Sequence, residues 1–381
     1  MNPTERLAQL KEQGLYRRRR VIEGAQGIEV WVDGERLINF SSNDYLGLAN
    51  HPAVVSALKN GAERYGVGSG SAHLICGHSS AHHALEEELA DFTGRRRALL
   101  FSTGYMANIG VISALVGRSD KVLEDRLNHA SLLDGGLLSR AQFQRYRHAD
   151  SADLEDKLSG SSRRQLIVTD GVFSMDGDLA PLPAMAKLAE EHQATLMVDD
   201  AHGIGVLGDH GAGVLQHFGL SQQQVPVLMG TLGKGLGTFG AFVAGSEDLI
   251  ELLIQQARSY VFTTAMPAAV AEATRASLKI VRTEPWRREK LQMLSQRFRE
   301  GASQLGWRLL DSASAIQPIL IGDSRQTIAA SEALLRQGYW VGAIRPPTVP
   351  QGQARLRVTF SANHQQQHVD GLLTALAAIK L

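Results

Sequence analysis

Short apolar runs alternate with amphipathic helical stretches over much of the chain, from about Asn50 to Ser246. The strand-like runs are ALLF, KVLE, QLIVTD, TLMVDD, PVLMG and GAFVAG, and stretches such as SAHHALEEELADFTG and LPAMAKLAEEHQ lie between several of them. Continuously apolar strands that alternate with amphipathic helices are typical of a mostly parallel sheet with helices on both faces. We therefore expect an α/β fold whose functional residues gather at the carboxyl ends of the strands.

The flanking segments predict two smaller parts. A polar helix to about Gln13 precedes GIEVWVDGERLINF, in which an Asp-Gly turn indicates a hairpin. One long helical region, from about Pro267 to Leu305, leads into a strand and helix pattern. The predicted division is an N-terminal helix and extended segment (1–49), a large cofactor-binding domain (50–266), and a linking helix with a small C-terminal α+β domain (267–381).

The composition argues against several classes of partner. Lys+Arg and Asp+Glu both number 39 among 381 residues, so the net charge gives no reason to expect nucleic acid or an anionic membrane. The N-terminus lacks the apolar region of a secretory signal, and no run of about 18 apolar residues could span a membrane. The single cysteine, Cys76, fits a reducing compartment, so we expect the cytoplasm. Its neighbours offer no clear activating pair, and we expect it to be a small packed residue.

Lys234 lies between two glycines in the stretch VLMGTLGKGLGTFG. A phosphate-binding P-loop would need a glycine five residues before the Gly-Lys pair and a Ser or Thr after the lysine, where Leu228 and Gly235 stand instead. Two interpretations stay open from this stretch alone. One is a turn with a solvated lysine, and the other is a lysine that forms a Schiff base where glycines let a flat ring approach.

Two other segments favour the Schiff base. In TLMVDDAHGIG a strand runs into Asp199, Asp200 and His202, and in LLFSTGYMANIGVISAL a strand ends at Phe101 before a helix that begins near Tyr105. A metal site at the acidic segment would need further ligands that local spacing does not supply. Pyridoxal 5′-phosphate (PLP) needs a lysine, a carboxylate on its pyridine nitrogen and a phosphate cradle such as a helix start. The three segments together predict PLP.

These segments resemble those of the α-oxoamine synthase family of fold-type I PLP enzymes. The matching stretches span residues 17–360 and include NFSSNDYLGLA, DRLNHASLLDG, GVFSMDGDLAPL, VDDAHGIGVLG, GTLGKGLGTFG, FTTAMP and AIQPILIG. The stretch AIRPPTVPQGQARLRVTF favours the branch that acts in biotin biosynthesis. The stretch GSGSAHLICGHS departs from the family, in which a further glycine and residues other than histidine are common, so the roles of His73 and His78 stay open.

The resemblance implies a role for each matching residue. Lys234 would bind the PLP aldehyde, Asp199 would pair with the pyridinium nitrogen, and His202 would contact the phenolic oxygen. His129 would stack on the ring and complete the catalytic set. The further cofactor contacts implied are Ser174 beside the ring oxygen, Gly104, Tyr105 and Thr231 at the phosphate, and Thr264 at the phosphate of a neighbouring subunit in a homodimer. The substrate contacts implied are Arg17, His129, Thr348 and Arg357.

The implied reaction is that of a PLP-dependent acyltransferase, which condenses L-alanine with a pimeloyl thioester of CoA or of a carrier protein. Branches that share the core motifs stay open: 2-amino-3-ketobutyrate CoA ligase, 5-aminolevulinate synthase and serine palmitoyltransferase. A PLP aminotransferase is an alternative reaction class, whereas a PLP-binding regulator would need a nucleic-acid-binding domain for which the chain has no room. Arg355 and Arg357 share one face of a strand, so Arg357 is chosen as the carboxylate ligand from the resemblance alone. Arg355 is expected to be a surface or ion-paired residue.

Overall fold

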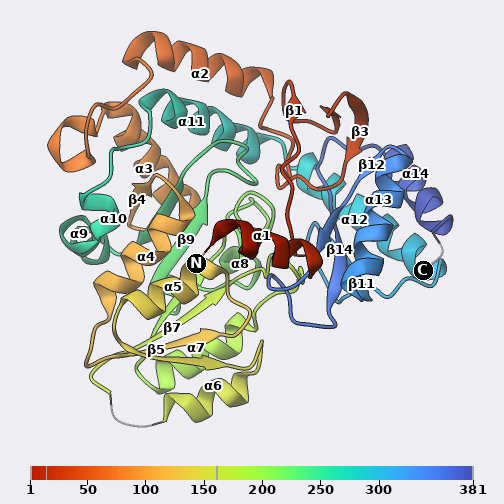
Figure 1. Cartoon of the computed structure of the whole chain (residues 1–381). Helices are drawn as coiled ribbons and strands as arrows, with labels where there is room; N and C mark the ends of the chain where they lie inside the picture. The colour runs from red at the N-terminus through yellow and green to blue at the C-terminus, as the bar shows by residue number, and fades with distance from the viewer. Residues whose placement is uncertain (1, 14, 160–161, 380–381) are drawn as a thin grey trace. The chain divides into compact units, whose positions relative to one another are not determined.

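The computed structural model describes residues 2–13, 15–159 and 162–379, which form two compact units. The large unit comprises residues 46–174 and 179–288, and the C-terminal unit comprises the described residues of 1–45, 175–178 and 289–381. Both are α/β in character (Figure 1). The finer division into segments 1–49, 50–266 and 267–381 stays a prediction.

A seven-stranded sheet forms the centre of the large unit, in the order β4-β10-β9-β8-β7-β5-β6. Strand β10 is antiparallel to both of its neighbours, β4 and β9, and the remaining neighbours are parallel. The predicted, mostly parallel sheet is confirmed. The strand bounds are β4 Arg97–Phe101, β5 Lys121–Asp125, β6 Gln142–Tyr146, β7 Gln165–Asp170, β8 Thr195–Asp199, β9 Val227–Thr231 and β10 Ala241–Gly245.

Helices cover both faces of this sheet (Figure 1). Successive strand residues point to opposite faces, so Leu99 and Leu100 of β4 belong to different apolar clusters. Buried residues of α3 Ser80–Thr93, α6 Ser151–Leu158, α7 Leu182–Glu191, α8 Val214–His217 and α11 Ala268–Thr283 pack on the Leu100 face. Those of α4 Gly104–Leu115, α5 Ala130–Leu138, α9 Glu247–Gln256 and α10 Arg258–Val261 pack on the Leu99 face. The sheet and the helices on its two faces form three layers, and the loops lie at the strand ends.

The C-terminal unit contains two small sheets, in the orders β1-β2-β3-β12 and β11-β14-β13. The hairpin predicted at Asp33-Gly34 is confirmed, because both residues have positive φ, 53° and 83°, as its tight turn requires. The strand bounds are β1 Ile22–Glu23, β2 Glu29–Val32, β3 Glu35–Asn39, β11 Ile316–Gly322, β12 Tyr339–Trp340, β13 Gly342–Ile344 and β14 Ala354–Thr359. The helices include α1 Pro3–Glu12, α13 Ser324–Arg336 and α14 Gln366–Ala377. The predicted small α+β unit is confirmed.

Three local features differ from the sequence-based expectations. The single long helix expected between residues 267 and 305 is wrong, because α11 ends at Thr283 and a second helix, α12 Trp286–Gln304, follows. Pro285 disfavours helical backbone at the preceding residue, Glu284, which has φ −121° and ψ 66°. Strand β6 has no apolar run to predict it, because it is an edge strand with only Tyr146 buried. Cys76, expected to be packed, is exposed on a one-turn π-helix.

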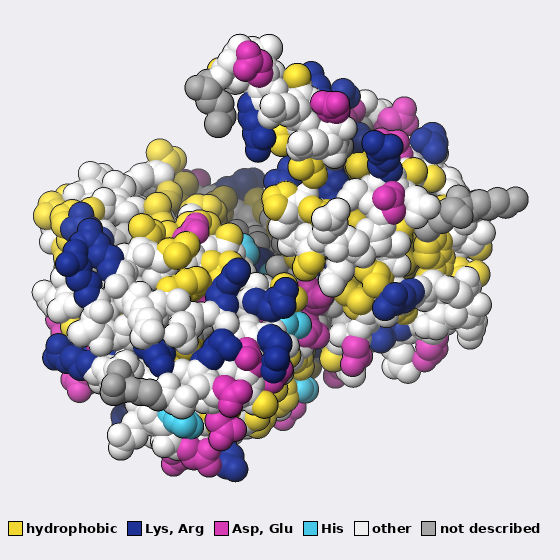
Figure 2. Space-filling model, turned by 60° about the horizontal axis from the view of Figure 1, so that its bottom comes forward, with side chains coloured by type: hydrophobic (Ala, Val, Ile, Leu, Met, Phe, Trp, Pro, Cys, Tyr) yellow, Lys and Arg dark blue, Asp and Glu magenta, His cyan; other side chains and the backbone are white. Residues whose placement is uncertain are grey.

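Within the described ranges, no helix has the length and apolarity to cross a bilayer. On the face drawn in Figure 2, basic and acidic side chains are interspersed with hydrophobic ones, in keeping with equal numbers of positive and negative residues. Neither sign of charge therefore dominates that face.

Gly61 lies within α2 Pro52–Tyr65, where this helix packs against α11. A Cβ at residue 61 would lie 2.8 Å from the Cα of Ala269, which is closer than a backbone can tolerate. Replacing glycine by alanine inside a helix usually stabilises by about 0.5–1 kcal/mol. We expect Gly61→Ala instead to lower the free energy of unfolding, by about 1–3 kcal/mol from overpacking, as measured by urea denaturation. Asn60→Ala, at the exposed neighbouring position, is the control and should not destabilise; equal stability of the two variants would contradict the close helix contact.

Candidate active site

The predicted cofactor residues of the large unit follow the carboxyl ends of its strands. His129 follows β5, Ser174 follows β7, Asp199 ends β8 and Lys234 follows β9. Gly104 follows β4, and β4 runs in the same direction as β9 because both are antiparallel to β10. The sheet therefore brings these residues to one edge, as its predicted topology requires.

The amine of Lys234 lies 2.9 Å from Nε2 of His202, which is buried. Tight backbone packing positions the two loops. A Cβ at Gly235 would lie 2.3 Å from the carbonyl oxygen of Ile204, whereas a Cβ at Gly233 would have no neighbour closer than 3.5 Å. Residue 235 must therefore be glycine for the two loops to make contact. The sequence had suggested a different role for the glycines, which was to leave room for a flat ring.

Asp199 is buried at the end of β8, with a relative exposure of 3%. Its Oδ2 accepts a hydrogen bond of 2.7 Å from Asn108 Nδ2, and its Oδ1 accepts one of 2.9 Å from the backbone N–H of Ala201. Both carboxylate oxygens therefore have donors that fix the orientation of the group.

Two further buried aspartates surround Asp199. Asp170 is its register partner on β7, and burial, followed by the charge of Asp199, raises the pKa of Asp170 well above the usual range. Burial likewise raises the pKa of Asp200, whose Oδ2 accepts a 2.7 Å hydrogen bond from the N–H of Val214. Asp200 thus fixes the loop that follows it. The raised pKa values of Asp170 and Asp200 favour their neutral forms, which would reduce the repulsion between these carboxyl groups and Asp199.

His129 is attached to the same cluster through its backbone and its ring. Its N–H donates to Asp170 Oδ2 over 2.6 Å, and its Nδ1 lies 2.8 Å from Ser131 Oγ. Burial lowers the pKa of His129, although the charge of Asp199 acts in the opposite direction. The imidazole is therefore neutral at pH 7 and offers a flat, uncharged surface. The ring of Tyr105 meets it edge-on, with centroids 6.4 Å apart.

The start of α4 is arranged as an anion-binding site. Thr103 caps the helix, and its Oγ1 accepts a 3.2 Å hydrogen bond from the N–H of Met106. The N–H groups of Gly104 and Tyr105 belong to the first turn, where no intrahelical acceptor exists, so they can bind a phosphate. Ser102 donates to the carbonyl oxygen of Thr264 at 3.2 Å, which links the residue 264 segment to the same turn. Thr231, at the end of β9, donates to the carbonyl oxygen of Gly240 at 3.1 Å.

Asn108 is a site residue that the sequence-based reasoning missed. It is fully buried, and its Nδ2 donates both to Asp199 Oδ2 and, over 2.9 Å, to Ser131 Oγ. Asn108 and Ser131 therefore connect Asp199 to His129. The available signal was a single asparagine in the mostly apolar helical run MANIGVISAL, because a buried amide needs polar partners.

The predicted substrate residues Arg17, Thr348 and Arg357 belong to the C-terminal unit. Arg17 donates to Thr348 Oγ1 at 3.0 Å, so these two residues are in direct contact. Arg357 donates to Asn43 Oδ1 at 3.1 Å and interacts with the hydroxyl of Tyr45. Arg355 is only 1% exposed and forms a 2.7 Å ion pair with Asp176. Arg355 is therefore ion-paired, which is one of the two expected alternatives. Arg357 instead contacts the neutral side chains of Asn43 and Tyr45.

The groups at the sheet edge fit the requirements of PLP. An amine lies beside an imidazole, a buried carboxylate has its orientation fixed by Asn108, a neutral imidazole is available for stacking, and a helix start can bind a phosphate. Each of these groups matches one part of the cofactor.

The chain is similar to known proteins over nearly its whole length. The family model for aminotransferase class I and II matches residues 35–376. A relative from Thioalkalivibrio sulfidiphilus, named 8-amino-7-oxononanoate synthase, is 66% identical over 372 residues, which cover 97% of this chain and 95% of the relative. A serine palmitoyltransferase variant from S. paucimobilis with a bound PLP–myriocin aldimine is 32% identical, with a TM-score of 0.93, and the match covers 98% of this chain and 96% of that one. The structure of 8-amino-7-oxononanoate synthase from Francisella tularensis is 32% identical, with a TM-score of 0.80, and covers 90% and 97% of the two chains.

Removing the Asn108 amide should destabilise the site. Asn108→Ala would leave Asp199 Oδ2 buried without this donor, and an unsatisfied buried charge costs about 1–3 kcal/mol or more. We expect a corresponding decrease in the free energy of unfolding, measured by urea denaturation at pH 7. Ser131→Ala is the matched control, since it keeps the bond between Asn108 and Asp199 and should cost less. Equal losses in the two variants would show that the bond to Asp199 is not the important one.

Proposed function

The chain belongs to the aminotransferase class I and II family and, within it, to the 8-amino-7-oxononanoate synthases, and on this basis we propose that it condenses L-alanine with a pimeloyl thioester to give 8-amino-7-oxononanoate, CO₂ and the free thiol. The observation that carries the catalytic part of the proposal is the contact between Lys234 and His202 at the same sheet edge as Asp199. The choice of substrates rests on the 66% identity to the relative with that name. The serine palmitoyltransferase and the synthase from Francisella tularensis are both 32% identical to this chain, so their TM-scores of 0.93 and 0.80 do not decide between their substrates.

The enzyme is PLP-dependent, and the cofactor, when bound, supplies an aldehyde that combines with amines and a pyridinium ring that withdraws electrons from the substrate α-carbon. Lys234 would hold the aldehyde, and Asp199 would pair with the protonated ring nitrogen. His202 would donate to the ring oxygen, with Ser174 beside it. The phosphate would be bound by the N–H groups of Gly104 and Tyr105 and by Thr231.

Lys234 is the proposed base. With alanine in the site, the Nζ amine of Lys234 would remove the alanine Cα proton. The same carbon then attacks the thioester carbonyl, the thiol leaves, and the alanine carboxylate departs as CO₂. Lys234 returns a proton to that carbon. The neutral ring of His129 would cover the reacting plane without adding a charge.

The C-terminal unit offers a basic pocket for the carrier of the acyl chain. This pocket has a volume of about 690 Å³, and its lining includes Lys11, Arg18, Arg19, Arg20 and Arg345. CoA and the phosphopantetheine of a carrier protein both contain phosphates, which guanidinium groups bind well. We expect this pocket to bind those phosphates, with the neighbouring Arg17 and Thr348 at the acyl chain.

The exposure of Thr264 supports the proposal of a homodimer, and the single cysteine supports a place in the cytoplasm. Its carbonyl oxygen is bound by Ser102 of its own chain, beside the phosphate cradle, whereas the residue as a whole is exposed. An exposed threonine in this position is available to a second copy of the chain, whose cofactor phosphate it would contact.

Product analysis tests the proposed reaction. The PLP-loaded protein, incubated with L-alanine and pimeloyl-CoA, should produce 8-amino-7-oxononanoate and free CoA in equal amounts, detected by mass spectrometry. Glycine and L-serine with other acyl-CoAs should react much more slowly. Lys234→Ala is the control, and it should abolish both turnover and the borohydride-reducible link to PLP. Faster product formation from glycine or serine would instead assign another α-oxoamine synthase, and transamination of alanine with a 2-oxo acid would assign an aminotransferase.

Kinetics of three arginine variants test the proposed carboxylate ligand. Arg357→Lys keeps the charge but loses the two-pronged contact with the alanine carboxylate, so the KM for alanine should rise about tenfold, the equivalent of one charge-assisted hydrogen bond. The KM for the acyl thioester should change little, whereas Arg17→Lys should show the opposite bias. Arg355→Lys disturbs the ion pair with Asp176 and should reduce stability without raising the KM for alanine. A higher KM in Arg355→Lys, with Arg357→Lys unchanged, would reverse the assignment.

A further inference from the structure

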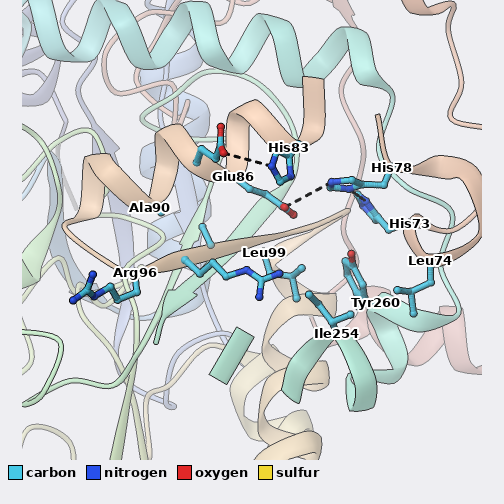
Figure 3. A pocket seen from close by; sticks show the side chains of 13 residues that line it. His73, Leu74, His78, His83, Glu86, Ala90, Arg96, Leu99, Ile254 and Tyr260 are labelled. Carbon is cyan, nitrogen blue, oxygen red and sulfur yellow. Dashed lines mark hydrogen bonds and ion pairs between the residues drawn. The ribbon is translucent and has the colours of Figure 1, made fainter. Parts of the chain in front are cut away.

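A histidine-rich cluster lies in the large unit, separate from the residues assigned to PLP. His73, His78, His83 and Glu86 line a pocket of about 260 Å³ together with Tyr260 and other residues (Figure 3). His73 and His78 are the two histidines by which the sequence departs from its family resemblance. The proposed reaction uses none of these side chains.

Three members of the cluster have the geometry of a metal-binding group. One ligand atom from each of His78, His83 and Glu86 lies within 4.8 Å of the other two. Glu86 follows His83 by three residues on α3, so both side chains lie on the same side of that helix. His78, from the segment before α3, points toward Glu86, with 4.0 Å between His78 Nε2 and Glu86 Oε2 (Figure 3). We propose that His78, His83 and Glu86 bind a divalent transition-metal ion.

Contacts behind Glu86 and His78 orient these two side chains, whereas the exposed His83 lies with its Nε2 3.4 Å from Glu87 Oε1. The Oε1 atom of Glu86 accepts a 2.9 Å hydrogen bond from the N–H of Leu100 on β4, which leaves Oε2 directed toward His78. The Nδ1 atom of His78 lies 2.9 Å from Nδ1 of His73, which stacks on Tyr260 with ring centroids 5.0 Å apart. Supporting contacts of this kind fix the ring orientation and tautomer of metal-binding histidines.

The spacing between Glu86 and His78 suits a bound cation. The 4.0 Å between Glu86 Oε2 and His78 Nε2 is too long for a hydrogen bond, so neither atom is held by the other. The Glu86 side chain is only 14% exposed, and a cation bound beside it would compensate its charge. Arg97, the nearby cation, forms a 3.2 Å ion pair with Glu251.

The ligand set narrows the choice of metal. Two imidazoles and one carboxylate suit Zn²⁺, Co²⁺ or Ni²⁺ with water at the remaining positions, rather than Ca²⁺ or Mg²⁺, which prefer oxygen ligands. Bonds of about 2.0–2.2 Å in a tetrahedral site would place the ligand atoms about 3.3 Å apart. The ligand atoms, which lie within 4.8 Å of one another, must therefore move closer, and His78 and His83 are exposed enough to do so.

Metal titration of the chelator-treated, PLP-loaded protein tests the proposal. Co²⁺ is the probe, because a tetrahedral nitrogen and oxygen site gives visible absorption, and Zn²⁺ is then added in competition. The expected result is one Co²⁺ per chain, fully displaced by one Zn²⁺. His83→Ala and His78→Ala should each weaken Co²⁺ binding by at least about tenfold. Glu86→Gln should do the same if it remains folded, and His83, being exposed, gives the variant least prone to unfolding.

Two controls separate this site from other sources of metal binding. His217→Ala removes an exposed histidine elsewhere in the large unit and should leave Co²⁺ binding unchanged. Cys76→Ser removes the exposed thiol near the cluster and should also leave it unchanged. The proposal is overturned if the wild-type protein binds Co²⁺ no more tightly than His83→Ala, or if Cys76→Ser, rather than the histidine variants, abolishes binding. Turnover is not the readout, so failure of the condensation reaction would not affect this test.

Discussion

The buried carboxylate of Asp199 is the feature around which the large unit is arranged. Isolated charges are costly to bury, and this one is stabilised by Asn108 and by the N–H of Ala201. Burial raises the pKa of its neighbours Asp170 and Asp200, which favours their neutral forms and limits repulsion. A buried negative charge whose position is fixed can pair with a pyridinium nitrogen without reorganisation of solvent, which is the electrostatic condition for stabilising charge that develops during the reaction.

Parallel strands explain why the other site residues can act on the same cofactor. The carboxyl ends of β5, β7, β8 and β9 lie at one edge, and a loop after each strand contributes a side chain. Close packing between two of these loops then sets the finer geometry, since Gly235 lets the lysine loop approach the carbonyl oxygen of Ile204. The distance from Lys234 to His202 thus depends on the backbone as well as on the two side chains.

The sequence predicts this arrangement well where strand alternation and strand-end residues carry the information. Asp199, His202 and Lys234 are visible because each follows an apolar strand, and the cradle is visible because a strand, a short turn and a helix come in succession. Asn108 is not visible in this way, because its importance comes from contacts with residues 23 and 91 positions away. Strand β6 was not predicted because an edge strand needs no continuous apolar run. The break between α11 and α12 was not predicted because it depends on the single residue Pro285. Packing details such as the exposure of Cys76 depend on which side of a single turn faces the core.

The histidine cluster and the phosphate cradle share two structural supports, although they use different residues. Glu86 binds the N–H of Leu100 on β4, the strand that leads into the cradle at Gly104. The ring of His82 contacts that of His73, and its Nε2 lies 2.6 Å from the carbonyl oxygen of Met266. Two residues before Met266, the carbonyl oxygen of Thr264 accepts a hydrogen bond from Ser102. The segment from Thr264 to Met266 is therefore anchored at one end to the cradle turn and at the other to the histidine cluster. Because this short segment joins both places, His82, whose ring packs against that of His73, also supports the segment beside the phosphate site.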